Sequence, residues 1–298
     1  GLRVWDSTDK AKADKKDLIE VITNIKPSDL YQLAFDRWLL QTQQNENFAV
    51  VPATVDGRLM TGLALGGTLE TGVTTQHSYG MPMLAGSSVK GTVRAYAESL
   101  FTKKDADGKV ILDEKGKTQI DDAMKPILDT LFGADEEAEQ ANAGYLVWHD
   151  AWFIPISKDN PFVDEIVTVH HQKYYAGQLD EALDMESPVP NQQLAVQGSF
   201  YFVIEGANQQ WLAFAKQLLE NMLTESGMGA KGTSGYGYFE DVVSNKSKEL
   251  NSKLEIYVNQ LKKKILEVEK VKALEEELTK LTENQQLIKK FEANLPSQ

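Results

Sequence analysis

The chain has 298 residues, enough for one large domain or two ordinary ones, and 42% of them are hydrophobic, enough for a sizeable core. Its formal net charge of −13 excludes a protein that finds nucleic acid through overall charge alone. It contains no cysteine, which excludes disulfides and thiolate metal sites and suits a cytoplasmic protein. No apolar run approaches the roughly 18 residues of a membrane-spanning helix, so we expect no membrane partner.

The N-terminal part of the chain has helical patterning. After a polar stretch over residues 1–16, apolar residues recur every three or four positions from Asp17 to Trp38, and Pro27 interrupts them. A polar linker occupies residues 41–47. We therefore assign residues 1–47 to an N-terminal tail and helices.

Residues 48–245 predict an α+β core. The residue patterns predict, in chain order, strand 48–54, helix 86–101, strands 144–154 and 194–205, helix 209–223 and strand 236–243. This β-α-β-β-α-β order is the ferredoxin-like (RRM-like) order, which RNA-recognition modules also use. Residues 102–142 are rich in acids and predict an exposed insertion that holds a short helix over 124–131.

The C-terminal part, residues 246–298, predicts a coiled-coil-like helical extension. Apolar residues recur there every three or four positions with Lys and Glu between them, beginning with Leu250, Leu254, Tyr257 and Leu261. One long helix and a helical hairpin both fit this pattern.

The stretch from Glu70 to Arg94 predicts a loop that opens a helix near Gly86. Ser87 and Ser88 are N-cap candidates, and Lys90 and Arg94 lie four residues apart on one helix face. A helix N-terminus with hydroxyls and cations is an arrangement that binds phosphate. A capped amphipathic helix with two solvated cations fits the same pattern.

A second loop, Gly227 to Gly237, contains five glycines and one cation but no acid. Glycines let backbone N–H groups approach a phosphate closely. The loop is no P-loop, since Lys231 precedes Gly232 and no Gly-Lys-Ser/Thr sequence is present. Gly229, Lys231, Gly232 and Thr233 are therefore phosphate-contact candidates, and a flexible connection between a helix and a strand is the alternative.

Histidines and tyrosines supply further RNA-contact candidates. His77 could stack on a base or donate to a phosphate, or it could be satisfied by the backbone. His170 and His171 are adjacent in a strand-like segment and point to opposite sides, which argues against a shared metal. We expect structural or stacking roles for them, with Tyr174 and Tyr175 as stacking candidates and core or interface packing as the alternative.

The two loops in this order resemble the RAMP superfamily of CRISPR proteins. Two blocks, Leu69–Arg94 and Val167–Gly177, resemble more narrowly the RAMP subunit that caps the crRNA 3′ side of type III-B (Cmr) effector complexes. The second block, with its His-His-Gln-Lys-Tyr-Tyr sequence, discriminates best, because general RAMP proteins lack it. The matching blocks run from about residue 48 to 243 and leave out both helical ends.

The resemblance implies a non-catalytic, crRNA-binding scaffold without metal or cofactor. Its implied partners are crRNA, target RNA, the neighbouring RAMP backbone subunit, the small subunit and the first-numbered Cmr RAMP subunit. In that family, target-RNA cleavage belongs to the backbone subunit, and a separate large subunit makes the second messenger.

Two other interpretations remain open at this point. One is a metal-independent endoribonuclease of the RAMP type, with a histidine as general base and Lys231 or Lys90 stabilising charge. The other is a helical scaffold whose RNA contact is trivial.

Overall fold

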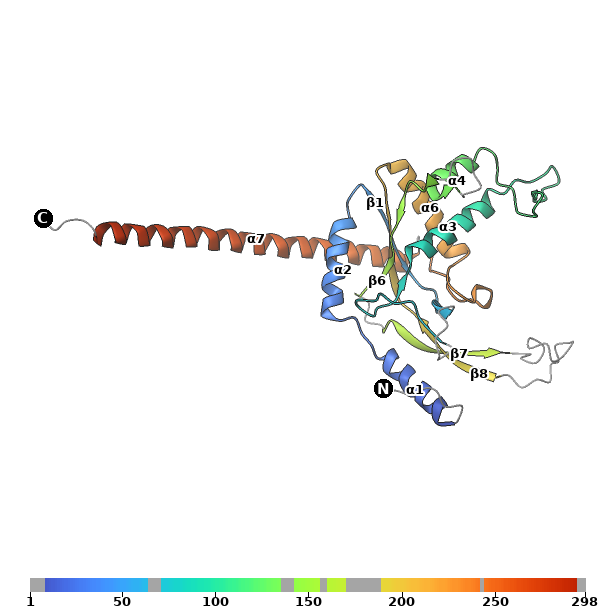
Figure 1. Ribbon diagram of the computed structural model, residues 1–298, viewed down its shortest axis with the longest axis horizontal. Coiled ribbons are helices and arrows are strands. Elements are labelled where there is room, and N and C mark those ends of the chain that lie inside the picture. Colours follow the sequence, from blue (N-terminus) through green and yellow to red (C-terminus); the bar gives the residue numbers. More distant parts are fainter. Residues whose placement is uncertain are drawn as a thin grey trace. The chain divides into compact units, whose positions relative to one another are not determined.

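The computed structural model of the chain describes residues 9–63, 71–134, 142–155, 160–169, 189–241 and 244–293 (Figure 1). The chain divides into two compact units, Gly1–Leu250 and Asn251–Gln298. In the described ranges, no helix has the length and apolar character needed to cross a membrane.

An antiparallel sheet forms the centre of the first unit. Its strands are ordered β1-β9-β6-β2, and β5 pairs with β9 beside β6. The strand bounds are β1 (Phe48–Thr54), β2 (Met83–Leu84), β5 (Val147–Trp148), β6 (Ala151–Phe153) and β9 (Ser199–Glu205). β1 pairs with β9 along its whole length, from Phe48 opposite Glu205 to Thr54 opposite Ser199.

The last predicted strand lies on the other side of β1. Phe239 forms an antiparallel bridge with Val55, and the Glu240 N–H donates to the Thr54 carbonyl at 2.8 Å. The spatial order is therefore segment 236–240, β1, β9 and β5/β6. This is the ferredoxin-like order of an α+β fold, as the sequence predicts.

Three predicted strands are less regular than expected. The strand predicted over 144–154 is interrupted at His149 and Asp150, which separate β5 from β6. The one predicted over 194–205 breaks at Gly198, whose φ of +97° allows the turn between β8 (Val189–Val196) and β9. β8 pairs instead with β7 (Phe162–Val169) in a separate two-stranded sheet. The described part of the last predicted strand, residues 236–241, forms no regular strand and has a single isolated bridge, between Phe239 and Val55.

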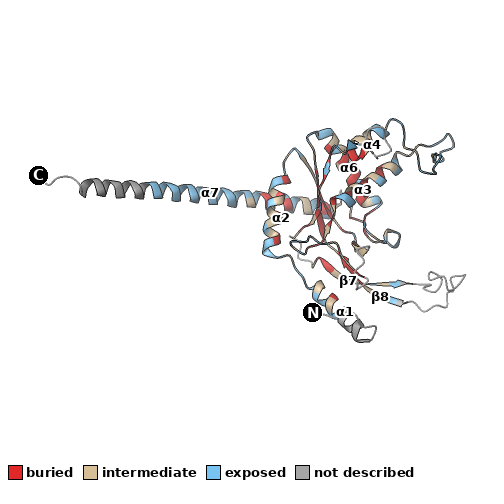
Figure 2. Ribbon diagram, in the orientation of Figure 1, coloured by how far each residue is buried: buried red, intermediate tan, exposed pale blue. Residues whose placement is uncertain are grey.

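Helices cover both faces of the central sheet (Figure 1). α3 (Gly86–Leu100) and α6 (Gln209–Glu225) pack together on one face, and α2 (Asp29–Thr42) lies on the other. Successive strand residues point to opposite faces, so Phe200 and Phe202 join the main core while Tyr201 meets Phe35 of α2. Buried positions, red in Figure 2, gather on these strands and helices.

α2 is fixed to the sheet by aromatic packing and two hydrogen bonds. Tyr31 stacks on Trp152 with ring centroids 5.9 Å apart, and its hydroxyl donates to the Phe153 carbonyl at 2.6 Å. The Thr42 and Tyr201 hydroxyls lie 3.0 Å apart. The aromatic side chains of this sheet face are therefore occupied by a helix of the same chain.

The remaining elements surround this core. α1 (Asp9–Thr23) contacts β7. Residues 102–120 form three successive antiparallel bridges, Thr102 to Ile120, Lys104 to Val110 and Leu112 to Thr118. They lead into α4 (Lys125–Phe132), the short helix that the sequence predicts, and then into β3 (Gly133–Ala134) and β4 (Asn142–Ala143), which pair with each other.

α7 (Asn245–Ala293) is one continuous helix, which decides against the helical hairpin. Ser244 caps its first turn, where the Ser247 N–H donates to the Ser244 hydroxyl oxygen at 3.2 Å. In the second unit, the apolar side chains of Ile265, Val268, Val271 and Leu274 are exposed.

Replacing Tyr31 with Phe should test the attachment of α2. The substitution keeps the ring but leaves the buried Phe153 carbonyl without its donor, so we expect a loss of about 1–3 kcal/mol in unfolding free energy. Tyr145→Phe is the matched control, because the Tyr145 side chain is exposed and its hydroxyl makes no hydrogen bond with a described residue. Denaturant unfolding measures both, and equal stabilities would contradict the assigned role of this hydrogen bond.

Candidate nucleic-acid interface

One short segment, Leu59 to Gly62, contacts both loops that the sequence singles out. The Ala230 N–H of the glycine-rich loop donates to the Met60 carbonyl at 2.7 Å. The Thr61 hydroxyl donates to the Thr74 hydroxyl oxygen at 3.1 Å, and a Cβ on Gly62 would lie 2.7 Å from the Thr74 nitrogen. The fold therefore brings the loop before α3 and the glycine-rich loop to the same part of the molecule.

The glycine-rich loop, residues 227–237, is closed by backbone contacts at its ends. The Met228 N–H donates to the Gly237 carbonyl, and the Gly237 N–H donates to the Arg58 carbonyl, both at 2.9 Å. A Cβ on Gly237 would lie 2.0 Å from the Met228 carbonyl oxygen, and Gly237 has a φ of +83°. Only glycine fits this approach without a backbone shift.

The tip of the glycine-rich loop carries the four residues predicted to contact phosphate. Lys231 adopts a left-handed φ of +61°, and a single 3-10 turn, Gly232–Ser234, follows it. Gly229, Lys231 and Thr233 are exposed and Gly232 is half-buried. The loop is thus folded into a specific turn that presents a cation and a hydroxyl to solvent.

The loop before α3 folds back on itself between Thr75 and Pro82, which form a bridge. The Gln76 N–H donates to the Met81 carbonyl, and the Gly80 N–H donates to the Gln76 carbonyl, both at 2.8 Å. His77 lies exposed in this turn. Its imidazole is therefore accessible to a ligand from solvent.

The N-terminus of α3 differs from the sequence prediction. Ala85 is the N-cap residue and makes no side-chain cap bond, so Ser87 and Ser88 are exposed first-turn residues and not caps. The Gly86 N–H donates instead to Asp150 Oδ1 at 2.7 Å. A Cβ on Gly86 would lie 2.1 Å from the Trp148 carbonyl oxygen, which explains why the helix begins there with glycine.

This contact changes the electrostatics of the predicted phosphate site. The negative charge of a carboxylate interacts favourably with the positive end of the helix dipole, as the charge of a phosphate would. A phosphate near Ser87 would also meet the negative charge of Asp150. The site therefore depends on its cations more than on the helix end.

The cations of the site differ in how far they are already paired. Arg94 Nε donates to Glu98 Oε1 at 2.8 Å on the same helix, and Arg58 Nε lies 3.7 Å from Glu165 Oε2. Within the described part of the chain, Lys90 and Lys231 form no ion pair. These two lysines are the cations best placed to neutralise phosphate.

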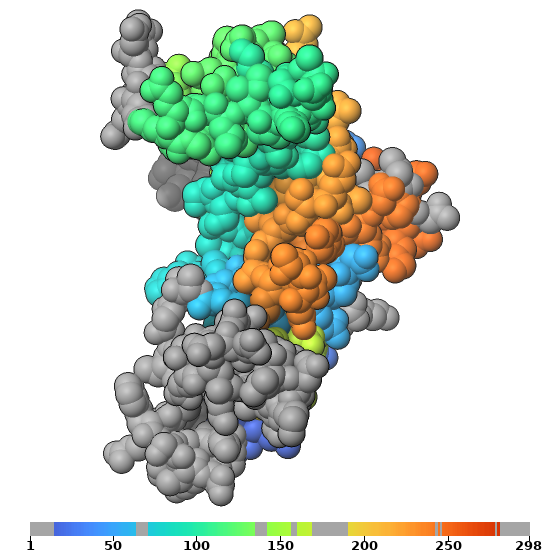
Figure 3. Space-filling view, turned by 90° about the vertical axis from the view of Figure 1, so that its right-hand side faces the viewer, coloured from blue at the N-terminus to red at the C-terminus, as the bar shows by residue number. Residues whose placement is uncertain are grey.

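Figure 3 shows the glycine-rich loop on the same face of the molecule as α6 and α3. On the face turned to the viewer, the orange surface of α6 and the glycine-rich loop adjoins the teal surface of α3.

The predicted contacts His170, His171, Tyr174 and Tyr175 lie outside the described residues. Among the residues that are described, no group of three or more His, Asp or Glu side chains could hold a metal ion.

Sequence reasoning missed several polar residues around these loops: Asp150, Arg58, Glu165 and Tyr236. The polar pair His149-Asp150 inside an aromatic, β-prone run was an available signal for a break in the strand. Glu165 had no comparable signal, because its partners are distant in sequence and become neighbours only through the fold.

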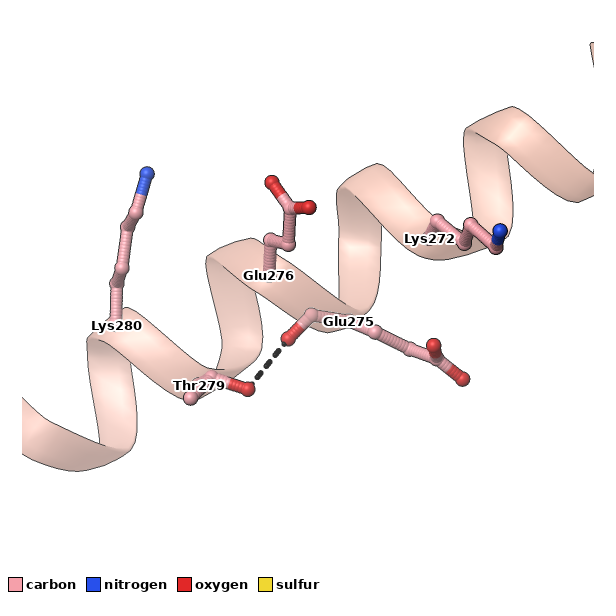
Figure 4. A pocket seen from close by; sticks show the side chains of 5 residues that line it. All are labelled: Lys272, Glu275, Glu276, Thr279 and Lys280. Atoms are coloured by element: carbon pink, nitrogen blue, oxygen red, sulfur yellow. Dashed lines mark hydrogen bonds between the residues drawn. The ribbon is translucent and has the colours of Figure 1, made fainter.

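Two shallow hollows on α7 are lined by side chains of this helix and form no enclosed site. One is lined by Lys272, Glu275, Glu276, Thr279 and Lys280, all from successive turns of this helix (Figure 4). The Thr279 hydroxyl donates to the Glu275 carbonyl at 2.8 Å, as exposed helical threonines commonly do. The candidate interface therefore stays with the two loops of the first unit.

Comparison with known families decides the relationship. The family model of the RAMP superfamily matches residues 53–240, more than half of the chain and both loops. This chain belongs to the RAMP superfamily. No curated protein shows a significant sequence match to it.

Solved structures similar to this chain include three CRISPR proteins. A chain of the cryo-EM structure of the type III-B Cmr-beta bound to cognate target RNA is 20% identical, with a TM-score of 0.54 over 78% of this chain and 72% of that one. Cmr6 from Pyrococcus furiosus is 19% identical, with a TM-score of 0.36 over 65% of this RAMP chain and 98% of Cmr6. A chain of a CRISPR RNA-guided surveillance complex is 13% identical, with a TM-score of 0.39 over 64% and 66%. The first comparison shows a shared fold.

Two glycines of the loop should differ in their tolerance of alanine. Gly237→Ala places a Cβ against the Met228 carbonyl at positive φ, so we expect a loss of about 1–3 kcal/mol in unfolding free energy. Gly232→Ala meets no atom within 4 Å and should change stability by less than about 1 kcal/mol. Denaturant unfolding of both variants checks this, and similar losses would show that the closed loop geometry is wrong.

Proposed function

We propose that this RAMP protein is a non-catalytic, crRNA-binding scaffold subunit of a type III-B (Cmr) RNA-targeting effector complex. In this proposal it holds the 3′ part of the crRNA and caps the backbone filament in antiviral defence. The single observation that carries the RNA-binding role is the contact of both loops with segment 59–62. Lys231 lies on one of these loops, and Lys90 lies in the first turns of α3, the helix that the other loop leads into.

The polar groups of the two loops support a subunit that binds RNA independently of its base sequence. Lysines, hydroxyls and loop N–H groups bind phosphates and position a strand without reading its bases. The sheet face that RNA-recognition modules use for base stacking is covered here by α2. A guide RNA has a different sequence in every complex, so a subunit that grips its backbone suits that task.

The fold likeness supports the assignment to a type III-B complex. The Cmr-beta structure contains a chain of the same fold and is bound to cognate target RNA. As partners of the present chain we propose those that the family resemblance of its sequence implies: crRNA, target RNA, the neighbouring RAMP backbone subunit, the small subunit and the first-numbered Cmr RAMP subunit. A cytoplasmic location follows from that assembly.

Loss of the two lysines should weaken RNA binding. For Lys90→Ala and Lys231→Ala, we expect lower affinity for labelled crRNA and a salt slope smaller by about 0.7 per lost phosphate contact on a single strand. Lys109→Ala is the matched control, because Lys109 is exposed in the insertion that follows the other end of α3. Fluorescence anisotropy across a salt series measures both the affinity and the salt slope. Unchanged slopes in both variants would show that neither lysine contacts an RNA phosphate.

The same RNAs distinguish the scaffold from the endoribonuclease alternative. The scaffold should leave crRNA and target RNA intact on a denaturing gel, with wild-type chain and with His77→Ala. Cleavage by the wild-type chain that disappears in His77→Ala would instead assign His77 as the general base. Binding and cleavage are read from the same samples, so loss of binding is not mistaken for loss of chemistry.

A further inference from the structure

The carboxylate of Glu165 lies where the β7–β8 hairpin meets the glycine-rich loop. Glu165 is on β7, opposite Gln193 of β8. Its Oε2 lies 3.7 Å from Arg58 Nε, and only a quarter of its side chain is exposed (25%). The Tyr236 hydroxyl of the glycine-rich loop donates to the same carboxylate. Burial of the Tyr236 hydroxyl raises its pKa most, and the negative charge of Glu165 raises it further.

Arg58 extends the junction to a third segment. Its Nη1 donates to Gln197 Oε1 at 2.8 Å, just beyond β8, and its carbonyl accepts from the Gly237 N–H at 2.9 Å. The neighbouring Leu59 exchanges two backbone hydrogen bonds of 2.8 Å with Val196 of β8. Segment 58–60, the hairpin and the glycine-rich loop are thus joined through one small polar cluster, which we name the Glu165 junction (Arg58, Glu165, Gln197 and Tyr236).

A negative charge beside an RNA-binding loop lowers the affinity for phosphate unless it serves another purpose. Here the carboxylate of Glu165 meets one cation, Arg58, and one hydroxyl, that of Tyr236, from different segments. A hydrogen bond to a carboxylate, such as that of the Tyr236 hydroxyl, is stronger than a neutral one, and the ion pair with Arg58 at 3.7 Å adds a weaker attraction. The geometry therefore argues for a structural use of this charge.

We propose that Glu165 is a positioning residue for RNA binding, which fixes the glycine-rich loop relative to the β7–β8 hairpin. The inference rests on the proposed RNA-binding function. It makes a prediction whose sign is opposite to simple electrostatics: removing this acid weakens RNA binding although it makes the protein less negative.

The test compares two neighbouring acids on one strand. Glu165→Ala should weaken binding of labelled single-stranded oligouridylate about fivefold, the factor for loss of one ordered contact, and should lower the salt slope as Lys231 loses its phosphate. Asp164→Ala removes the same charge from the preceding residue. The Asp164 side chain is exposed, and its Oδ2 accepts from Gln192 Nε2 at 2.7 Å. It should bind as well as wild type or better. Tyr236→Phe, which deletes only the hydroxyl, should follow Glu165→Ala in direction.

Hydrogen exchange separates this inference from the proposed function. Without RNA, Glu165→Ala should speed exchange of the loop amides between Gly229 and Tyr236, and Asp164→Ala should not. If the wild-type chain does not bind RNA but the loop still loosens, the proposed function fails and the junction stands as structural only. If Glu165→Ala binds RNA as tightly as Asp164→Ala, or leaves loop exchange unchanged, the positioning role is overturned. A uniform loss of stability would lower the active fraction without changing the salt slope.

Discussion

The close approach of the glycine-rich loop to segment 58–62 is the constraint on which the proposed interface depends. Backbone meets backbone there, at the Gly237 N–H with the Arg58 carbonyl and at the Ala230 N–H with the Met60 carbonyl. No side chain can intervene at Gly237, so the spacing is set by glycine itself. Because segment 58–62 also contacts Thr74 and β8, the same approach places the loop before α3 and the β7–β8 hairpin. The position of Lys231 in the loop follows from these backbone contacts.

The ferredoxin-like core is used here differently from an open RNA-recognition sheet. α2 closes one face with Tyr31, Phe35 and Leu39, all fully buried, while α3 and α6 close the other. Exposed side chains at the two loops include His77 before α3, and Lys231 and Thr233 in the glycine-rich loop. The fold alone does not determine the function, and in this chain α2 covers the sheet face that RNA-recognition modules use for base stacking.

The sequence predicts the order of the elements well, because strand and helix periodicities and the glycine-rich loop are local signals. It predicts less well where tertiary contacts override them. Ser87 and Ser88 have the chemistry of caps, yet Asp150 reaches Gly86 from a break between two strands. The run 194–205 reads as one strand, and Gly198 divides it between two sheets. The pairing of Arg58 with Glu165 joins residues that no short-range pattern connects. His170, His171, Tyr174 and Tyr175 remain predictions.

The attachment of α2 also has a consequence for the order of folding during synthesis. Its two anchoring hydrogen bonds span 122 and 159 residues of sequence, from Tyr31 to Phe153 and from Thr42 to Tyr201. β1 likewise needs β9 from the far side of the core. Contacts of such long range form late, and the ribosome delivers the N-terminal end first. α2 is therefore made well before its partners Phe153 and Tyr201, and its aromatic side chains can be buried against the sheet only after β6 and β9 have been synthesised.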